Sequence, residues 1–162
     1  KVFFERLETA PLILLEASHE ERIDITLQEY VHDALAEFCV AYGEANGFQR
    51  WADYLRNSTD RIQRRLGGER HARVRKMLDH AIEQHAQKGE SEQHRAWIGC
   101  LLSDYYDGMY EHQLNSKADR ILFRGDRTEV LGFLQHEFGV AVREPCEAQG
   151  PITSNERGRT DK

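Results

Sequence analysis

The side chains best suited to chemistry are concentrated in one basic segment, residues 60–76. This segment carries seven Arg or Lys residues against two acidic ones, a local charge of +5. The whole chain of 162 residues has a net charge of −6, so the remainder carries −11 and offers no general polyanion-binding surface. Guanidinium groups are planar and donate several hydrogen bonds, which suits phosphate oxygens. The predicted phosphate-binding residues are Arg61, Arg64, Arg65, Arg70, Arg73 and Arg75.

A glycine pair, Gly67 and Gly68, interrupts the helical pattern in the middle of this segment. Two helices joined by glycines could hinge, so that the arginines close over a bound phosphate as a lid. The alternative is a solvated helix face whose arginines pair with acidic neighbours.

A second group of polar residues follows the two predicted strands. In open α/β sheets, ligands bind outside the carboxyl ends of the strands. The predicted substrate-facing residues there are Glu16, Arg22, Arg124 and Arg127. The alternative is that the acidic residues near the strand ends cap helices and the arginines pair with them on the surface.

Three tyrosines, Tyr105, Tyr106 and Tyr110, could stack on an exposed nucleobase, because single-stranded RNA is commonly bound through aromatic faces. Tyr105 lies on an apolar helical stripe and is assigned to the core. Tyr106 lies beside that stripe, so it is the predicted stacking residue, with a purely structural role as the alternative.

The eight histidines and three cysteines predict neither a catalytic nor a metal site. His80 and His85 are five residues apart and do not share a helical face as a metal-binding pair would. Cys39, Cys100 and Cys146 include no CxxC pair, which disfavours a disulfide framework and a structural zinc site. No GxxxxGK[ST] phosphate loop or nucleophile triad is present, so we name no catalytic residue and no metal ligand.

Two short apolar runs, at about residues 12–16 and 120–124, predict strands. Such runs are typical of parallel strands that are buried on both faces. A capping pattern follows each run, Ser18 with Glu21 and Asp126 with Glu129, so each strand is expected to lead directly into a helix.

Apolar residues at spacings of three and four predict five to six helices. They cover about residues 23–42, 48–66, from 69 onward, from 93 onward, and 127–138. Gly43 and Asn46-Gly47 should end the first of these helices, and Asp107-Gly108 should interrupt the fourth.

The fold class is therefore α/β and helix-rich. Two parallel-type strands about a hundred residues apart cannot form a stable open sheet alone, so we expect further strands upstream of this sequence. We assign residues 1–138 to the C-terminal part of a three-layer α/β domain, with a helical insertion at about residues 45–115. The apolar periodicity fails from residue 139, which predicts a disordered tail over residues 139–162.

The composition is that of a globular protein, with 40% apolar and 31% charged residues. No apolar run is long enough to cross a membrane, and no secretory or transit pattern is visible at the start. We expect the protein in the cytoplasm.

A series of ordered motifs extends over roughly residues 5–134. It comprises Tyr105-Tyr106-Asp107, Met109-Tyr110, Gln113, Lys117 to Arg120 and Phe123 to Asp126, together with Pro11 to Glu16, Glu21-Arg22, Tyr30-Val31 and Arg61-Ile62 through Leu66-Gly67-Gly68. In their order along the chain, these motifs resemble the C-terminal signature of the bacterial tRNA 2-selenouridine synthases. The chain departs from that family at Gly108, where Pro is usual, and at Glu111-His112, where Asp and an aromatic residue are expected.

The resemblance implies a transferase whose P-loop-type α/β domain follows a rhodanese-like domain with a reactive cysteine. It implies replacement of sulfur by selenium in wobble 2-thiouridine, with selenophosphate as donor and an S-geranylated intermediate made from geranyl diphosphate. The implied partners are tRNA at its anticodon region, upstream domains of the same polypeptide, and a selenophosphate-supplying protein. Neither the reactive cysteine nor the phosphate loop can be placed on this sequence, so the chain alone is expected to be inactive.

Two other classes of protein stay open at this point. One is a nucleotide-dependent small-molecule kinase fragment, in which the arginine lid would close over a nucleotide. The other is a noncatalytic helical interaction module.

Overall fold

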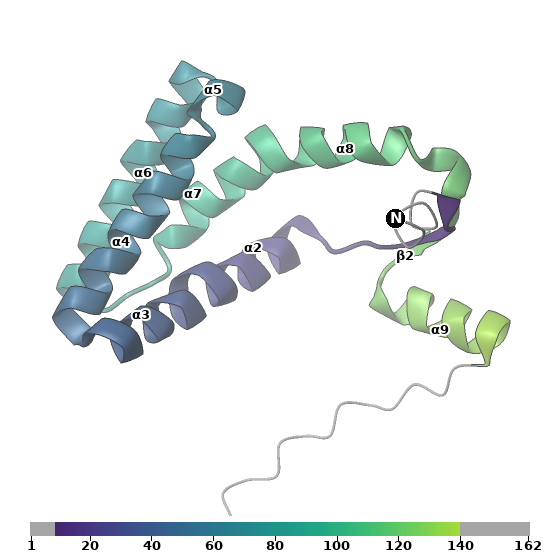
Figure 1. Cartoon of the computed structure of the whole chain (residues 1–162), viewed down its shortest axis with the longest axis horizontal. Coiled ribbons are helices and arrows are strands. Elements are labelled where there is room, and N and C mark those ends of the chain that lie inside the picture. Colours follow the sequence, from purple (N-terminus) through teal and green to yellow (C-terminus); the bar gives the residue numbers. More distant parts are fainter. Residues whose placement is uncertain (1–8, 140–162) are drawn as a thin grey trace, which may run out of the picture.

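The computed structural model describes residues 9–139. Two parallel strands, β1 (Leu12–Leu15) and β2 (Ile121–Gly125), are neighbours in one sheet although about a hundred residues separate them in sequence. Between the two strands the described chain is almost wholly helical, and one further helix, α9 (Arg127–Phe138), follows β2 (Figure 1). This confirms the predicted helix-rich α/β class, with both strands within one residue of their predicted positions.

Within residues 9–139 the two strands are covered on one face only, and the prediction that both faces are buried in the whole sheet stays a prediction. Leu15 is 59% exposed and Leu122 is 57% exposed. The reason is that α9 packs against both strands and covers one face of the sheet, where Phe123 stacks on Phe133 with ring centroids 4.4 Å apart. The register between the strands also shifts between Leu12 and Ile13, which leaves Leu122 without a paired residue.

Both predicted capping boxes are confirmed. The Ser18 hydroxyl accepts from the backbone N–H of Glu21, whose carboxylate accepts in return from the N–H of Ser18, and α2 (His19–Leu27) begins there. Asp126 and Glu129 make the same pair of bonds at the start of α9. Both strands therefore lead into helices over a short connection.

The first long helical rod covers residues 19–42. It consists of α2, a π-helical segment η1 (Gln28–Asp33) and α3 (Ala34–Tyr42), which ends at Gly43 with φ +77°. Asn46 and Gly47, predicted to lie in the loop after this rod, instead lie inside α4 (Glu44–Arg61). A Cβ at Gly47 would stand 2.6 Å from the Cα of Cys39, so glycine is there for close helix packing rather than for a turn.

The second long rod covers residues 94–115. It consists of α7 (His94–Leu101), a second π-helical segment η2 (Leu102–Tyr106) and α8 (Asp107–Asn115). The predicted interruption at Asp107-Gly108 is wrong, because the backbone stays helical through both residues. The side chain of Asp107 does not cap a helix and instead pairs with Arg22 of α2.

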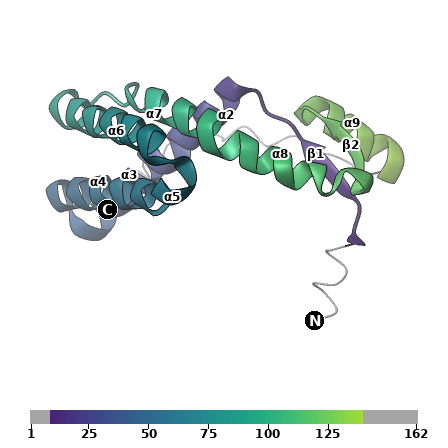
Figure 2. The same cartoon turned by 90° about the horizontal axis from the view of Figure 1, so that it is seen from above.

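The remaining helices form a hairpin between the two rods. The α4 helix is followed by the single turn α5 (Gln63–Leu66) and then, after Gly67 at φ +90°, by α6 (Gly68–Lys88). Figures 1 and 2 show this hairpin at one end of the molecule, with the strands and α9 at the other end. A short 3₁₀ turn, η3 (Ala118–Arg120), connects the second rod to β2.

The main hydrophobic core lies among the helices. Its buried side chains are Ile23, Leu27, Val31, Trp51, Ala52, Leu55, Leu66, Val74, Leu78, Ala81, Ile82, Trp97 and Ile98. The strands contribute none of these residues, so the described helices share a core that is independent of the small sheet. Within residues 9–139 no helix combines the length and the apolar character that a bilayer crossing requires.

The predicted limits of the helical insertion, about residues 45–115, stay a prediction. The predicted tail was residues 139–162. Gly139 ends α9, and residues 140–162, with Cys146, lie outside the described residues.

Candidate nucleic-acid interface

The basic segment lies where α4, α5 and α6 meet, at the α5 end of the α4–α6 hairpin, which is at the top of Figure 1. We call this region the basic tip. Arg61 closes α4, and Arg64 and Arg65 lie in α5. Arg61 and Arg64 are exposed, and neither makes a hydrogen bond or ion pair with any residue in the range 9–139. These two side chains are therefore available to an external anion.

Three further arginines of the segment contact the second rod. Arg65 donates from Nη1 to the Tyr105 hydroxyl at 3.4 Å, and Arg70 donates to the backbone oxygen of Asp104 at 3.4 Å. Arg73 pairs closely with the Asp104 carboxylate, which raises the pKa of Arg73. All three are exposed, so their contacts attach the tip to η2 while leaving guanidinium surface open to solvent.

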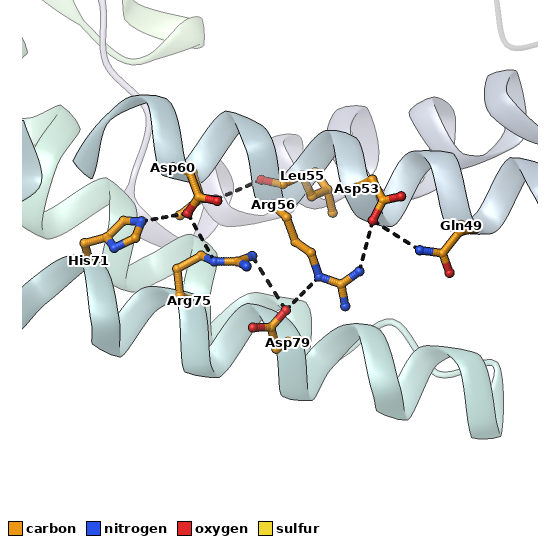
Figure 3. Close-up of polar contacts among 9 residues, drawn as sticks. Gln49, Asp53, Leu55, Arg56, Asp60, His71, Arg75 and Asp79 are labelled. Carbon is orange, nitrogen blue, oxygen red and sulfur yellow. Dashed lines mark hydrogen bonds and ion pairs between the residues drawn. The ribbon is translucent and has the colours of Figure 1, made fainter. Parts of the chain in front are cut away.

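Arg75 belongs to a different environment, shown in Figure 3. Its Nε lies 3.2 Å from an Asp60 oxygen and its Nη1 lies 3.6 Å from an Asp79 oxygen. Arg56 of α4 donates to the same Asp79 at 2.8 Å. Acidic and basic side chains alternate between the two helices, and each acidic group in this network is already paired. Arg75 therefore connects α4 to α6 and does not face outward.

Of the four predicted substrate-facing residues at the strand ends, the structure brings only two into contact. Glu16 and Arg124 form a close ion pair beside the sheet, the alternative that the sequence left open for them. Arg22 points to the second rod and pairs with Asp107, whose hydrogen bond raises the pKa of Arg22. Arg127 is exposed and has no partner within the described part of the chain. Both views place the strands away from α5 (Figures 1 and 2). Arg22 is nearer to the basic segment, because its partner Asp107 lies only three residues after Asp104, the partner of Arg73.

Tyr106 lies in η2 and lines a partly open apolar pocket of about 270 Å³ between the two rods and α4. Its ring is stacked with that of Tyr110 at 6.3 Å between centroids, and burial raises the pKa of its hydroxyl. The pocket was not predicted from the sequence, because its wall is assembled from three separate helical stretches. The lining residues are Thr26, Tyr30, Leu55, Ser58, Thr59, Ile62, Trp97, Ile98, Leu101, Leu102, Tyr106 and Tyr110.

Two histidines occupy the core rather than a metal site. His94 is completely buried, and burial, with smaller contributions from His85 and His32, lowers its pKa to about 4. His85 packs edge-on against Phe48 and Trp51. Across residues 9–139 no three His, Cys, Asp or Glu side chains are grouped as metal ligands.

The two described cysteines are poorly suited to nucleophilic chemistry. Burial, with Glu44 nearby, raises the pKa of Cys39. Burial and a hydrogen bond to Asp104 raise the pKa of Cys100, even though Arg73 opposes the shift. A thiol with a raised pKa carries little thiolate near neutral pH.

The fold and the site together define a helix-rich α/β protein with a cationic helical tip. Residues 1–140 match the family described as the tRNA 2-selenouridine synthase AAA domain, and the chain belongs to that family. This confirms the resemblance seen in the motifs from Pro11 to Asp126.

Curated relatives named tRNA 2-selenouridine synthase match most of the chain. The chain is 42% identical over 135 residues to that of Cupriavidus pinatubonensis, covering 83% of this chain and 37% of the relative. It is 43% identical over 132 residues to that of Bordetella bronchiseptica, covering 82% and 36%. It is 43% identical over 130 residues to that of Alcanivorax borkumensis, covering 80% and 36%. The chain thus spans little more than a third of the length of these relatives. No solved structure matches the chain.

Proposed function

We propose that this chain is the tRNA-anchoring part of a tRNA-modifying transferase that replaces sulfur by selenium in wobble 2-thiouridine. Support comes from the family to which the chain belongs and from the names of its curated relatives. The observation that carries the role of this segment is the basic tip, where five arginines are exposed: Arg61, Arg64, Arg65, Arg70 and Arg73. Within it Arg61 and Arg64 have no protein partner among the described residues.

The arrangement of the tip fits a phosphate backbone better than a single small anion. Arg61, Arg64 and Arg65 lie within five residues of one another at the junction of α4 and α5, and all three are exposed. Exposed guanidinium groups on a short helical stretch can contact successive phosphates, and the acidic remainder of the chain limits nonspecific binding. The anticodon region would then be positioned by the surrounding protein.

The proposed reaction uses selenophosphate as selenium donor and passes through an S-geranylated tRNA made from geranyl diphosphate, in the cytoplasm. We assign the reactive cysteine and the phosphate loop to upstream domains of the same polypeptide, and selenophosphate to a supplying protein. No described residue of this chain is given a catalytic role. Arg127 at the strand end, which has no partner among residues 9–139, is a second candidate contact for a diphosphate.

A charge-neutralising double variant tests the anchoring role. In the full gene product, Arg61→Gln with Arg64→Gln should weaken tRNA binding, because phosphate contacts are lost. The slope of log K against log salt should fall by roughly 1 to 2, since each lost phosphate contact removes about 0.7 to 0.9 from it. Filter binding of unmodified tRNA at several salt concentrations measures both quantities.

Arg50→Gln with Lys88→Gln is the matched control. Arg50 stacks over Tyr42 in the first half of α4, and Lys88 ends α6, so the same net charge is lost at the other end of the hairpin. The control should bind tRNA with nearly wild-type affinity and slope. If the two double variants lose tRNA affinity equally, or if neither loses it, the anchoring role of the tip is refuted.

A further inference from the structure

Helix α3 is apolar on all sides, yet none of its residues is buried. Its sequence is ALAEFCVAY, in which Glu37 is the only charged residue. A helix that is apolar all round is expected to be covered on every side. Among residues 9–139, however, the main packing partners of α3 are α4 and η1. The side of α3 that faces away from them is open to solvent and lacks the cover that its composition calls for.

The open side of α3 lies opposite the side that packs on the core. Leu35 and Phe38 pack against the helical core. Val40 is 90% exposed, the largest value among the exposed large apolar side chains of residues 9–139. Tyr42 is not part of the open side, because Arg50 of α4 lies over its ring at 4.4 Å. We call the exposed residues that recur at spacings of three and four from the end of η1 into α3 the outer face: Asp33, Ala36, Glu37, Val40 and Ala41.

The outer face carries negative charge that no cation of the described chain neutralises. Asp33 accepts a hydrogen bond from the Gln28 amide at 2.7 Å, and no basic side chain among residues 9–139 pairs with it. Glu37 has neither a hydrogen bond nor an ion pair with any residue in that range. Covering these carboxylates with an uncharged surface would remove their water without compensation. The outer face therefore fits a partner surface with an apolar centre and Lys or Arg at its rim.

Two other occupants fit the outer face less well. A nucleic acid would bring phosphates against Asp33 and Glu37, which repel them. A second copy packed face to face would bring the same two carboxylates and no basic residue, because an isologous interface repeats one patch. The rest of the polypeptide is the remaining source of cover. The chain spans 37% of the length of a curated relative, so the larger part of that protein lies outside it.

We propose that the outer face of α3 is the docking surface for an upstream domain of the same polypeptide. That domain meets Val40 with an apolar side chain and meets Asp33 and Glu37 with Lys or Arg side chains. The assignment to an upstream domain rests on the proposed function, which places the reactive cysteine and the phosphate loop there. Figure 1 shows α3 at the bottom of the view and α5 at the top. Docking on α3 therefore leaves the basic tip open to tRNA.

Photo-cross-linking of the full gene product identifies the occupant. Val40 is replaced by the photo-reactive amino acid p-benzoylphenylalanine, which its exposure allows without disturbing the core. Irradiation of an equal mixture of unlabelled and heavy-nitrogen protein should join position 40 to peptides upstream of Lys1 that carry the same label. Links between unlike labels would assign the face to a second copy and overturn the inference. So would a yield no higher than that of the same replacement at Ala86, an exposed residue of α6.

Carbodiimide labelling of carboxylates measures the cover in the wild-type full gene product, without any substitution. Glu37 should react at least about fivefold more slowly than Glu90, an exposed residue after α6, because a packed interface excludes the reagent. In a folded Ala36→Glu variant Glu37 should react as fast as Glu90, since a carboxylate in the apolar centre opposes docking. The matched variant Ala86→Glu should keep the wild-type difference. Equal rates in the wild type, or a slow Glu37 in folded Ala36→Glu, would overturn the inference.

The outcomes also separate this inference from the proposed function. If position 40 is joined to upstream peptides while the Arg61 and Arg64 double variant binds tRNA normally, the docking surface stands and the anchoring role fails. If tRNA binds through the basic tip while Glu37 and Glu90 react at the same rate, the docking surface fails and the anchoring role stands.

Discussion

The indole N–H of Trp97 donates to Nδ1 of His94 at 2.9 Å, one turn away in α7. An indole nitrogen can only donate, so Nδ1 of His94 is unprotonated and its proton lies on Nε2. Nε2 stands 3.3 Å from Nδ1 of His85, which therefore accepts. This chain of bonds requires both imidazoles to be neutral, and it fixes their tautomers at the centre of the helical core.

Stability should fall as the pH drops below neutrality. The pKa of buried His94 is lowered to about 4 in the folded state from 6.5, so the unfolded chain binds the proton more readily between these values. His94 therefore contributes stability that is fully present above pH 6.5 and is lost as the pH falls toward 4. At about 1.36 kcal/mol per pKa unit the loss is roughly 3 kcal/mol. Urea unfolding at pH 7, 5.5 and 4 measures it.

The variant His94→Asn tests whether His94 causes this loss of stability at low pH. An amide oxygen can still accept from Trp97 but does not titrate, so the variant should be less stable at pH 7 and should lose much less stability on acidification. His80→Asn, at an exposed position of α6, is the control for loss of a histidine. A His94→Asn variant with the full wild-type pH dependence would show that other groups cause it.

Two glycines inside helices should respond to alanine in opposite directions. A Cβ at Gly47 would lie 2.6 to 2.7 Å from backbone atoms of Phe38 and Cys39, so Gly47→Ala forces α3 and α4 apart and should destabilise by about 2 to 3 kcal/mol. At Gly108 nothing lies within 4 Å of the added Cβ, so Gly108→Ala should stabilise by about 0.5 to 1 kcal/mol through helix propensity. Thermal unfolding of both variants measures the difference, and a similar response in the two would contradict the assigned helix contact.

Arg75→Gln should lower stability without weakening tRNA binding. Its guanidinium joins Asp60 of α4 and Asp79 of α6, and losing such partly exposed ion pairs amounts to about 1 kcal/mol or less. The tRNA affinity and salt slope should match those of the wild type in the filter-binding assay. A loss comparable to that of the Arg61 and Arg64 double variant would show that Arg75 also faces the RNA.

The Arg22–Asp107 pair should couple the two long rods weakly but measurably. Both side chains keep about a third of their surface in solvent, so a double-mutant cycle with Arg22→Met and Asp107→Asn should give a coupling energy of about 0.5 to 1 kcal/mol. The coupling should shrink in 1 M salt, where exposed charges are screened. Additive effects of the two single changes would mean that the pair contributes nothing to the packing of α2 against the second rod.

Local sequence patterns predicted the elements well where the signal is local. The Ser18–Glu21 and Asp126–Glu129 capping boxes need only residues three apart, and both are present. The prediction of a loop at Asn46-Gly47 was wrong, because the same dipeptide occurs in turns and where two helices cross closely. Only the packing of Gly47 against Cys39 shows which of the two applies here.

The candidate site was predictable only in part for the same reason. The cluster of arginines between Asp60 and Lys76 is visible in the sequence, but their partners are not local. Arg73 is paired by Asp104 and Arg22 by Asp107, across 31 and 85 residues. The pocket combines residues from Thr26 to Tyr110, so no single stretch of sequence carries its pattern.

The most direct test of the account is mass spectrometry of nucleosides from total tRNA of the source cells, with the gene intact, deleted and restored, under selenium supply. The account predicts that 2-selenouridine disappears on deletion, that its 2-thiouridine precursor accumulates, and that the restored gene reverses both changes. Undiminished 2-selenouridine in the deletion strain would contradict the proposed function.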